Sequence, residues 1–417
     1  GSITTDGIVN VDAERDVTGI VIDANGDINI GTQDDTTEPQ TDNIVGIVAT
    51  SDGTVTLTAT TTIDAPNVSG TDAVLTAASI ANGSVTALTG SADLNATLGF
   101  ISDMDVNAVG NVLLDAEQDV VNTSVGAQGN IRVGQTSNLN SVETSQFAAR
   151  GVVDIDTDFD VHGSEISGGS TVDVTAGDDI DTTDIVASDA VTLEAADHIT
   201  DTDVTANTGD VMFTADTDAD GTGSIVGGSA TAEAGHIDLS ASEFITDIDV
   251  NAAQTVDLRT VLDVVNTSVL AGSDVTVGAA GDEVRSVHAG DITAGGVVTV
   301  DATKEVDNST IAALGLVTVN ANNVTNSNVD ADGQLTIDAD TDISNSIFKT
   351  DSAATATLTA GDSILNADLI AENTDATLTA GMDIDGGSVR AESVTETAGA
   401  SIANGSVTAL TGSADLN

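Results

Sequence analysis

The residues best suited to chemistry in this sequence are three aspartates that alternate along one short segment. Asp216, Asp218 and Asp220 lie in the run DTDADG, which ends at Gly221. Alternating carboxylates before a glycine let a tight turn direct several oxygens at one point, as calcium loops require. The twelfth position of an EF-hand loop would be Gly227 instead of Glu, so the bidentate ligand of that motif is missing. The three aspartates are candidate calcium ligands, and the alternative is an ordinary acidic loop.

A second acidic pattern precedes this one in the chain. Asp154, Asp156, Asp158 and Asp160 alternate, and the period of two predicts that they share one outward face of a strand. Such a row could gather divalent cations diffusely. A solvated strand face is the favoured interpretation.

Other patterns for catalysis or metal binding are weak. Without Cys, a thiol-dependent enzyme, a Cys-ligated zinc site and a disulfide scaffold are excluded. Some parallel β-helices cleave polysaccharides, but such an enzyme would want clustered basic residues and aromatic platforms for sugar. This chain has no Trp or Tyr, its four histidines fall at unrelated positions, and its basic residues are scattered: Arg132, Arg150, Arg259, Arg285, Arg390, Lys304 and Lys349. We therefore expect no enzymatic activity and no required cofactor, with calcium as the one candidate ion.

Composition excludes further classes of protein. The 417 residues include 68 acidic and 8 basic ones, and the net charge of −60 would repel the phosphates of nucleic acid. No apolar run is long enough to span a membrane. Hydrophobic residues make up 40% of the chain, which is too many for a disordered protein. Because only 1% of residues are aromatic, the core must be a thin one of Val, Ile, Leu and Ala.

Internal repeats organise the whole chain. Residues 79–95 recur unchanged as residues 401–417, and the segment from Phe100 reappears in similar form from Phe244. A finer unit consists of an aliphatic residue, four small or polar residues and a second aliphatic residue. It recurs about every 20 residues, with weak copies near Leu139, Ile225 and Val284.

The repeat predicts its own fold. A period-2 strand pattern precedes each aliphatic anchor, as Leu335, Ile337 and Ala339 precede Ile343. A unit of this length cannot bury its apolar face alone, so it must stack on copies of itself. We therefore predict an all-β protein, a parallel β-helix (β-solenoid) with about 20 residues per coil, in which Ile343 and Ile364 are vertical neighbours.

The same pattern predicts the domain organisation. Residues 1–417 are expected to form a single continuous solenoid of about 20 coils. The polar segment 31–43 contains Pro39 and is expected to leave an early coil as a loop. Residues 214–223 lie in the longest coil and are expected to form a second loop.

Two segments carry a resemblance to a known family. Thr357-Leu358-Thr359-Ala360-Gly361-Asp362-Ser363-Ile364-Leu365-Asn366 and Leu378-Thr379-Ala380-Gly381-Met382-Asp383-Ile384 are similar to the repeats of filamentous-haemagglutinin-type secreted β-helix exoproteins. The resemblance covers the chain from about residue 50 onwards. It implies a right-handed parallel β-helix, secretion, and a role in adhesion or as a surface fibre.

These observations lead to one functional expectation with two alternatives. We expect a structural protein, extracellular or on the cell surface, that forms a segment of a secreted fibre or a stalk. Its expected partner is itself, either as a longer chain or by head-to-tail stacking of coils. The first alternative is an adhesin whose surface binds cell-surface glycan or protein, and the second is an enzyme acting on polysaccharide.

Overall fold

The computed structural model describes residues 1–31, 41–136, 138–278 and 283–417. Its regular elements in these residues are all β-strands, and they form a parallel β-solenoid of about 21 turns spaced roughly 19 residues apart. The predicted fold class is confirmed. The chain divides into two units, the first made of Gly1–Asp197 and Asp201–Asn207 and the second of His198–Thr200 and Thr208–Asn417.

One coil of unit 1 shows how the sequence produces the fold. The long strand β11 (Ala73–Ala77) is followed by the short strand β12 (Ser79–Ala81) and then by β13 (Ser84–Ala87). Alternate residues of β11 are buried, because successive side chains of a strand point to opposite faces. The corner between β12 and β13 is formed by Asn82 and Gly83, as expected for residues that favour turns.

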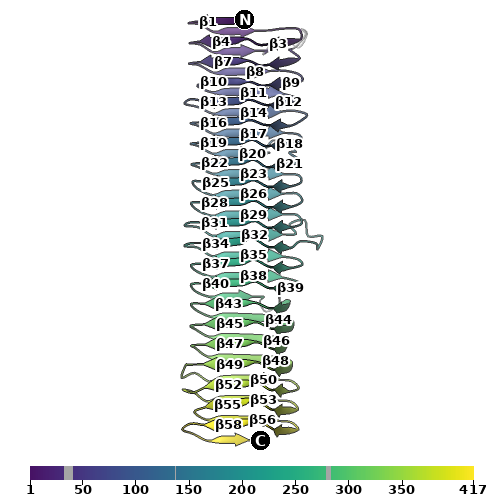
Figure 1. The fold of residues 1–417 in the computed structure, drawn as a ribbon, viewed down its shortest axis with the longest axis vertical. Coiled ribbons are helices and arrows are strands. Elements are labelled where there is room, and N and C mark those ends of the chain that lie inside the picture. The colour runs from purple at the N-terminus through teal and green to yellow at the C-terminus, as the bar shows by residue number, and fades with distance from the viewer. Residues whose placement is uncertain (32–40, 137, 279–282) are drawn as a thin grey trace. The chain divides into compact units, whose positions relative to one another are not determined.

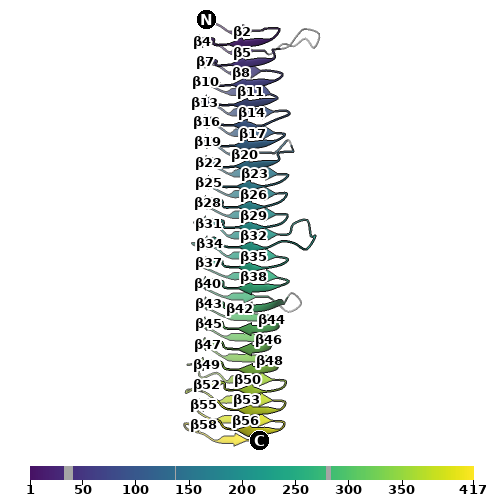
Figure 2. The same cartoon turned by 45° about the vertical axis from the view of Figure 1, so that its right-hand side comes forward.

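Each coil contributes to two parallel sheets in its unit. Sheet A holds the last strand of each coil and sheet B holds the other strands, including the long ones; Figures 1 and 2 show the two sets. Within the described residues of unit 1, the strands of sheet A are β1 (Ser2–Thr5), β4 (Val21–Ala24), β7 (Val48–Ser51), β10 (Asn67–Gly70), β13, β16 (Asp105–Ala108), β19 (Ser124–Ala127), β22 (Gln146–Ala149), β25 (Glu165–Gly168), β28 (Asp184–Ala187) and β31 (Asp203–Ala206). In the described residues of unit 2 they are β34 (Ser229–Ala232), β37 (Asp249–Ala252), β40 (Ser268–Ala271), β43 (Asp291–Ala294), β45 (Thr310–Ala313), β47 (Asn328–Ala331), β49 (Ile347–Thr350), β52 (Asp368–Ala371), β55 (Ser388–Ala391) and β58 (Ser406–Ala409).

The core consists of columns of equivalent side chains. Leu75 pairs with Leu57 on one side and Leu94 on the other, and all three are fully buried. In unit 2, Ile343 in β48 (Leu335–Ser344) pairs with Ile364 in β51 (Ile364–Leu365), so the predicted vertical neighbours are confirmed. Each such aliphatic side chain stabilises its coil by about 1.5–3 kcal/mol through burial.

The weak copies of the repeat are placed differently from the sequence interpretation. Ile225 does occupy the anchor column and pairs with Ile245. The anchors in the other two coils are Val142 and Val287, each three residues after the position expected from Leu139 and Val284. Leu139 and Val284 are nevertheless buried. Leu139 lies just before β21 (Ser141–Glu143), whereas Val284 is the first residue of β42 (Val284–His288) and pairs with Ala302.

The corner before each sheet A strand has a conserved geometry within the chain. The second residue after the anchor has a positive φ in coil after coil, for example 59° at Asn82 and 51° at Asn345. Asn tolerates this left-handed conformation better than most residues do. The next residue is often a buried Ser or Thr: the Ser327 amide donates to Ser346 Oγ at 3.1 Å, and Ser327 Oγ donates to the Thr325 carbonyl at 2.8 Å. Each buried hydroxyl therefore accepts from a backbone amide of the neighbouring coil and donates to a carbonyl of its own coil.

The two expected loops differ in what the structure shows. Most of the first, residues 32–40 of the segment 31–43, lies outside the described residues. The second follows β32 (Val211–Ala215) and precedes β33 (Ile225–Val226), so residues 216–224 form a connection and residues 214 and 215 still belong to the strand. Figure 2 shows this connection beside β32, projecting further than the neighbouring corners.

Candidate functional site

The candidate calcium ligands all lie in the connection between β32 and β33. Its backbone turns sharply, with positive φ values of 75° at Asp216, 59° at Ala219 and 93° at Gly221. A Cβ atom on Gly223 would lie 2.3 Å from the amide nitrogen of Asp216, so only glycine fits where the connection closes. The turn that the run DTDADG predicts is therefore formed.

The turn brings the three carboxylates together. One oxygen from each of Asp216, Asp218 and Asp220 lies within 4.8 Å of the other two. The Gly221 amide donates to Asp216 Oδ1 at 3.1 Å, and the Asp220 amide donates to Asp218 Oδ1 at 3.2 Å. Asp218 and Asp220 are exposed, whereas Asp216 is half-buried.

Local hydrogen bonds keep the inner carboxylate ionised. The Gly221 N–H is the main cause that lowers the pKa of Asp216, and the Ser242 hydroxyl lowers it further. The loop therefore presents charged oxygens near neutral pH. Three carboxylates supply part of the six to eight oxygens that calcium takes, so backbone carbonyls and water would have to supply the rest.

A second carboxylate cluster lies in unit 1, where the sequence pattern did not place one. Asp160, Asp178 and Asp179 are half-buried, and one oxygen from each lies within 4.8 Å of the others. The Asp179 amide donates to Asp160 Oδ1 at 3.2 Å. The residues come from neighbouring coils, since Asp160 precedes β24 (Val161–His162) and Asp179 precedes β27 (Ile180–Asp181). In the sequence, this cluster could have been found by searching for aspartates that are separated by the length of one coil.

The row of four alternating aspartates is split by a corner. Asp154 and Asp156 point outward from β23 (Val153–Thr157), as the period predicts. Asp158 and Asp160 follow the end of that strand and lie in the corner before β24. Thus only two of the four share a strand face.

Burial and like charge raise the pKa of several carboxyls in unit 1. Burial is the main cause for Asp93 and Asp154, with the charges of Asp115 and Asp173 on the next coil adding to it. The pKa of Asp178 is raised by burial and then by a hydrogen bond with Asp197 that favours the protonated form. Carboxylates stacked one coil apart therefore oppose each other's ionisation.

An acidic groove of about 450 Å³ opens in unit 2. Its charged lining residues are Glu283, Asp301, Asp338 and Asp340, and Asn320 lies among them. The Asn320 amide donates to Asp301 Oδ1 at 2.5 Å, so one carboxylate oxygen of the groove already has a hydrogen-bond partner.

The histidines are not brought together into a metal site. His162 pairs with Asp181 at 3.0 Å in unit 1, and in unit 2 His288 lies 3.6 Å from Glu305. His236 hydrogen-bonds Thr255 at 2.6 Å and His198 accepts from the Ser224 amide at 3.1 Å.

A polysaccharide site would need clustered arginines, but two of the arginines that are nearest in the sequence lie on different sheets. Arg132 points outward from β20 (Ile131–Val133) in sheet B. Arg150 follows β22 in sheet A.

No protein-family model matches the chain, and the search of curated proteins found no match. In the described residues, no helix is both long and apolar enough to cross a membrane.

The calcium prediction can be tested on the loop itself. We expect calcium to raise the melting temperature of the chain, because an ion that binds only the folded loop stabilises it by mass action. The double variant Asp218→Asn/Asp220→Asn should lose most of this rise, measured by calorimetry at fixed ionic strength.

The matched control for the calcium experiment is Asp178→Asn/Asp179→Asn, which removes the same charge from the other cluster. An equal calcium response in all three proteins would contradict a site at Asp218 and Asp220 and would indicate diffuse binding.

The raised carboxyl pKa values predict a pH dependence. A carboxyl whose pKa is raised in the folded chain binds its proton more tightly there, so the free energy of unfolding rises as the pH falls through the folded pKa. We expect the melting temperature to rise from pH 7 towards about 4, the ordinary range of aspartate. Below that range Asp263, whose pKa the Arg285 guanidinium lowers, loses its stabilising charge.

The pH response should depend on Asp178. Asp178→Asn should reduce the rise in melting temperature between pH 7 and about 4, whereas Asp12→Asn, at an exposed position, should leave it unchanged. A melting temperature that falls steadily on acidification from pH 7 would show that stacked carboxylates do not oppose folding.

Proposed function

We propose that this chain is a structural, non-enzymatic repeat protein that serves as a segment of a secreted fibre or a cell-surface stalk. The observation that carries the proposal is the regular register of the sheet A strands from coil to coil. Their equivalent residues pair within each unit, as Val85 with Val106 in unit 1 and Val329 with Phe348 in unit 2. A fold of this kind becomes longer when coils of the same design are added, which suits a protein that has to span a distance.

Its proposed partner is a further coil of the same kind, in a longer chain or in a second copy. The repeated segment supports this. In residues 79–95 the core residues Ile80 and Leu94 are fully buried between coils, because Ile80 pairs with Ile63 and Ile101. Residues 401–417 repeat this segment without change. The same coil sequence is therefore used twice in the chain, as expected of a protein built by adding units of one design.

The extracellular location is part of the same proposal. It is supported by the resemblance of residues 357–366 and 378–384 to the repeats of filamentous-haemagglutinin-type exoproteins. An adhesin that binds cell-surface glycan remains a second proposal, which the lack of Trp and Tyr makes the weaker one because those rings are common sugar platforms.

A chain extended by one coil tests the proposal. Adding a copy of residues 96–119 after Asn417 should bury Ile402 and Leu416, so amide hydrogen exchange in residues 401–417 should slow by at least about tenfold, which corresponds to about 1.4 kcal/mol. Mass spectrometry of exchanged peptides measures this directly.

The control extension carries Asp in place of the residues equivalent to Ile101, Val106 and Leu114. It should leave exchange in residues 401–417 fast. If both extensions slow exchange equally, or neither does, the coils are not interchangeable building units and the structural proposal fails.

A further inference from the structure

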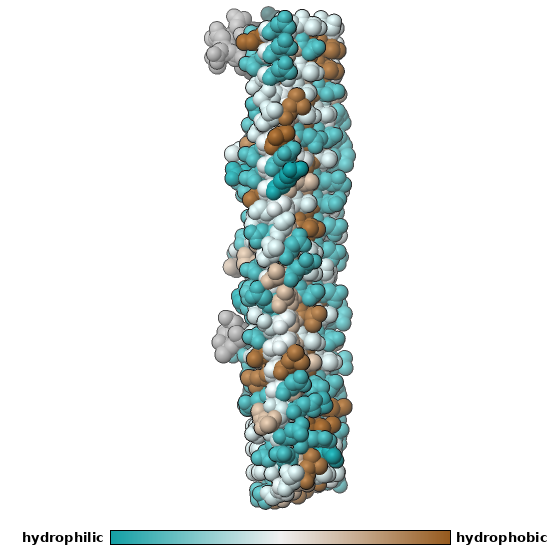
Figure 3. Space-filling model, turned by 90° about the vertical axis from the view of Figure 1, so that its left-hand side faces the viewer, coloured by the Kyte–Doolittle hydropathy of each residue, from teal (hydrophilic) through white to brown (hydrophobic). Residues whose placement is uncertain are grey.

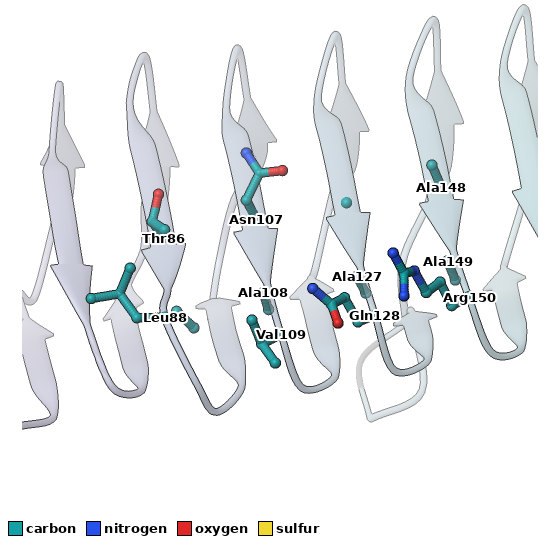
Figure 4. A pocket seen from close by; sticks show the side chains of 12 residues that line it. Thr86, Leu88, Asn107, Ala108, Val109, Ala127, Gln128, Ala148, Ala149 and Arg150 are labelled. Atoms are coloured by element: carbon teal, nitrogen blue, oxygen red, sulfur yellow. The ribbon is translucent and has the colours of Figure 1, made fainter.

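Two shallow grooves lie on the outer face of sheet A, one in each unit. The groove of unit 1 has a volume of about 450 Å³ and crosses β13, β16, β19 and β22 (Figure 4). The groove of unit 2 has a volume of about 420 Å³ and crosses β40, β43, β45 and β47. Figure 3 shows this face of sheet A, where hydrophobic residues interrupt the hydrophilic surface.

Each groove is lined by two columns of side chains. The strand column holds the third residue of each strand, and the edge column holds the first residue after each strand. In unit 1 the strand column is Thr86, Asn107, Gly126 and Ala148, and the edge column is Leu88, Val109, Gln128 and Arg150. In unit 2 the strand column is Leu270, Thr293, Ala312 and Asp330, and the edge column is Gly295, Leu314 and Asp332.

The unit 1 groove combines a hollow with one cation. Gly126 and Ala148 leave the strand column without large side chains, while Leu88 is 50% exposed beside it. Arg150 is exposed and forms no ion pair within the described residues. No carboxylate lines this groove, although the chain as a whole carries a net charge of −60.

The unit 2 groove has the opposite features. Leu270 and Leu314 project from it, 51% and 67% exposed. Its far end is acidic, since Asp330 and Asp332 both line it. Lys349 lies 3.4 Å from Asp330, and Asp332 is exposed beside that pair.

The two sets of columns are complementary when they face each other. If two coil stacks lie with parallel axes and face each other through sheet A, their strands run in opposite directions, so the edge column of one faces the strand column of the other. Matched coil by coil, Leu314 lies opposite the hollow at Gly126, and Arg150 lies opposite Asp330. Because every coil rises by the same distance of about 4.8 Å, the match holds over all four coils.

We propose that the unit 1 groove of one copy binds the unit 2 groove of a second copy, with Leu314 filling the hollow at Gly126 and Arg150 meeting Asp330 and Asp332. The contact joins two different surfaces, so a bound pair still offers one free groove of each kind, the unit 2 groove of one copy and the unit 1 groove of the other. Association is therefore open-ended and lateral. It adds a sideways contact to the proposed structural role and does not depend on coils stacking end to end.

A second copy of this chain fits the groove better than an acidic glycan does. Both halves of the contact are present on the chain, including the acidic partner for Arg150 and the leucine for the hollow. The large negative charge opposes the approach of two copies. Salt shortens the range of this repulsion, because the Debye length falls from about 10 Å at 0.1 M to about 3 Å at 1 M. Self-association should therefore appear as the salt concentration rises.

Exchanging the sizes of the two contacting residues tests the proposal. Sedimentation velocity of the wild-type chain should show monomer at 0.05 M NaCl and larger species at about 0.5 M. Gly126→Leu fills the hollow and Leu314→Ala removes the side chain that occupies it. Each variant should weaken association by at least about tenfold, equivalent to about 1.4 kcal/mol. The combined variant should recover much of it, because the leucine is supplied from the other side.

The variants are expected to fold, since Leu314 is exposed and a Cβ on Gly126 meets only the flexible Asn107 side chain. Circular dichroism checks this, and Val186→Ala, at an exposed position on β28 outside the groove, serves as the control that should not change association. A wild-type chain that stays monomeric at every salt concentration overturns the proposal. So does association that is unchanged in Gly126→Leu, or glycan binding that Arg150→Ala abolishes in a monomeric chain. None of these results affects the coil-extension experiment.

Discussion

The structure depends on the placement of each aliphatic side chain directly over its counterpart in the neighbouring coil. With 1% aromatic residues, no side chain can fill a wide interior, so the coil must be narrow enough for Val, Ile, Leu and Ala to meet across it. Leu75 between Leu57 and Leu94 shows the result, a column without exposed members. The parallel hydrogen bonds and the corner geometry follow from keeping these columns in register.

The same register brings like charges close together. Side-chain amides of asparagine reduce the repulsion between the stacked carboxylates. Asn82 donates to Asp64 Oδ1 at 2.8 Å and Asn404 donates to Asp385 Oδ1 at 2.8 Å, each across one coil. An amide above a carboxylate replaces repulsion with a hydrogen bond. Where burial and a neighbouring carboxylate act together, as at Asp93 beside Asp115, the carboxyl pKa is raised instead. Acidity and regular stacking are therefore compatible only in part, which makes stability sensitive to pH and salt.

The sequence predicts the repeating features well and the irregular ones poorly. Strand alternation and anchor spacing predict the solenoid and the contact of Ile343 with Ile364, since both depend on local periodicity. Val142 and Val287 as anchors could not be found by counting, because coil length varies: Val68 pairs with Val85 after 17 residues, whereas other coils are longer.

The candidate sites show the same difference between features that are local in the sequence and features that depend on the register between coils. The loop at Asp216 is local in sequence and was predicted as a group. The cluster of Asp160, Asp178 and Asp179 joins two coils, so it requires the register to within one residue. The grooves of sheet A depend on missing side chains, as at Gly126, and on exposure, which periodicity alone does not give.

Register between coils is the central claim, and cysteine pairs test it directly because the chain has no Cys of its own. Thr357 and Thr377 pair across β50 (Ala356–Ala360) and β53 (Ala376–Ala380), with Thr379 two residues further along. Paired positions lie about 4.8 Å apart, within the range that a disulfide spans, whereas the diagonal pair lies beyond about 7 Å. We predict that Thr357→Cys/Thr377→Cys forms an intramolecular disulfide under mild oxidation and that Thr357→Cys/Thr379→Cys does not. Equal yields from the two pairs, or a higher yield from the diagonal pair, would contradict the account.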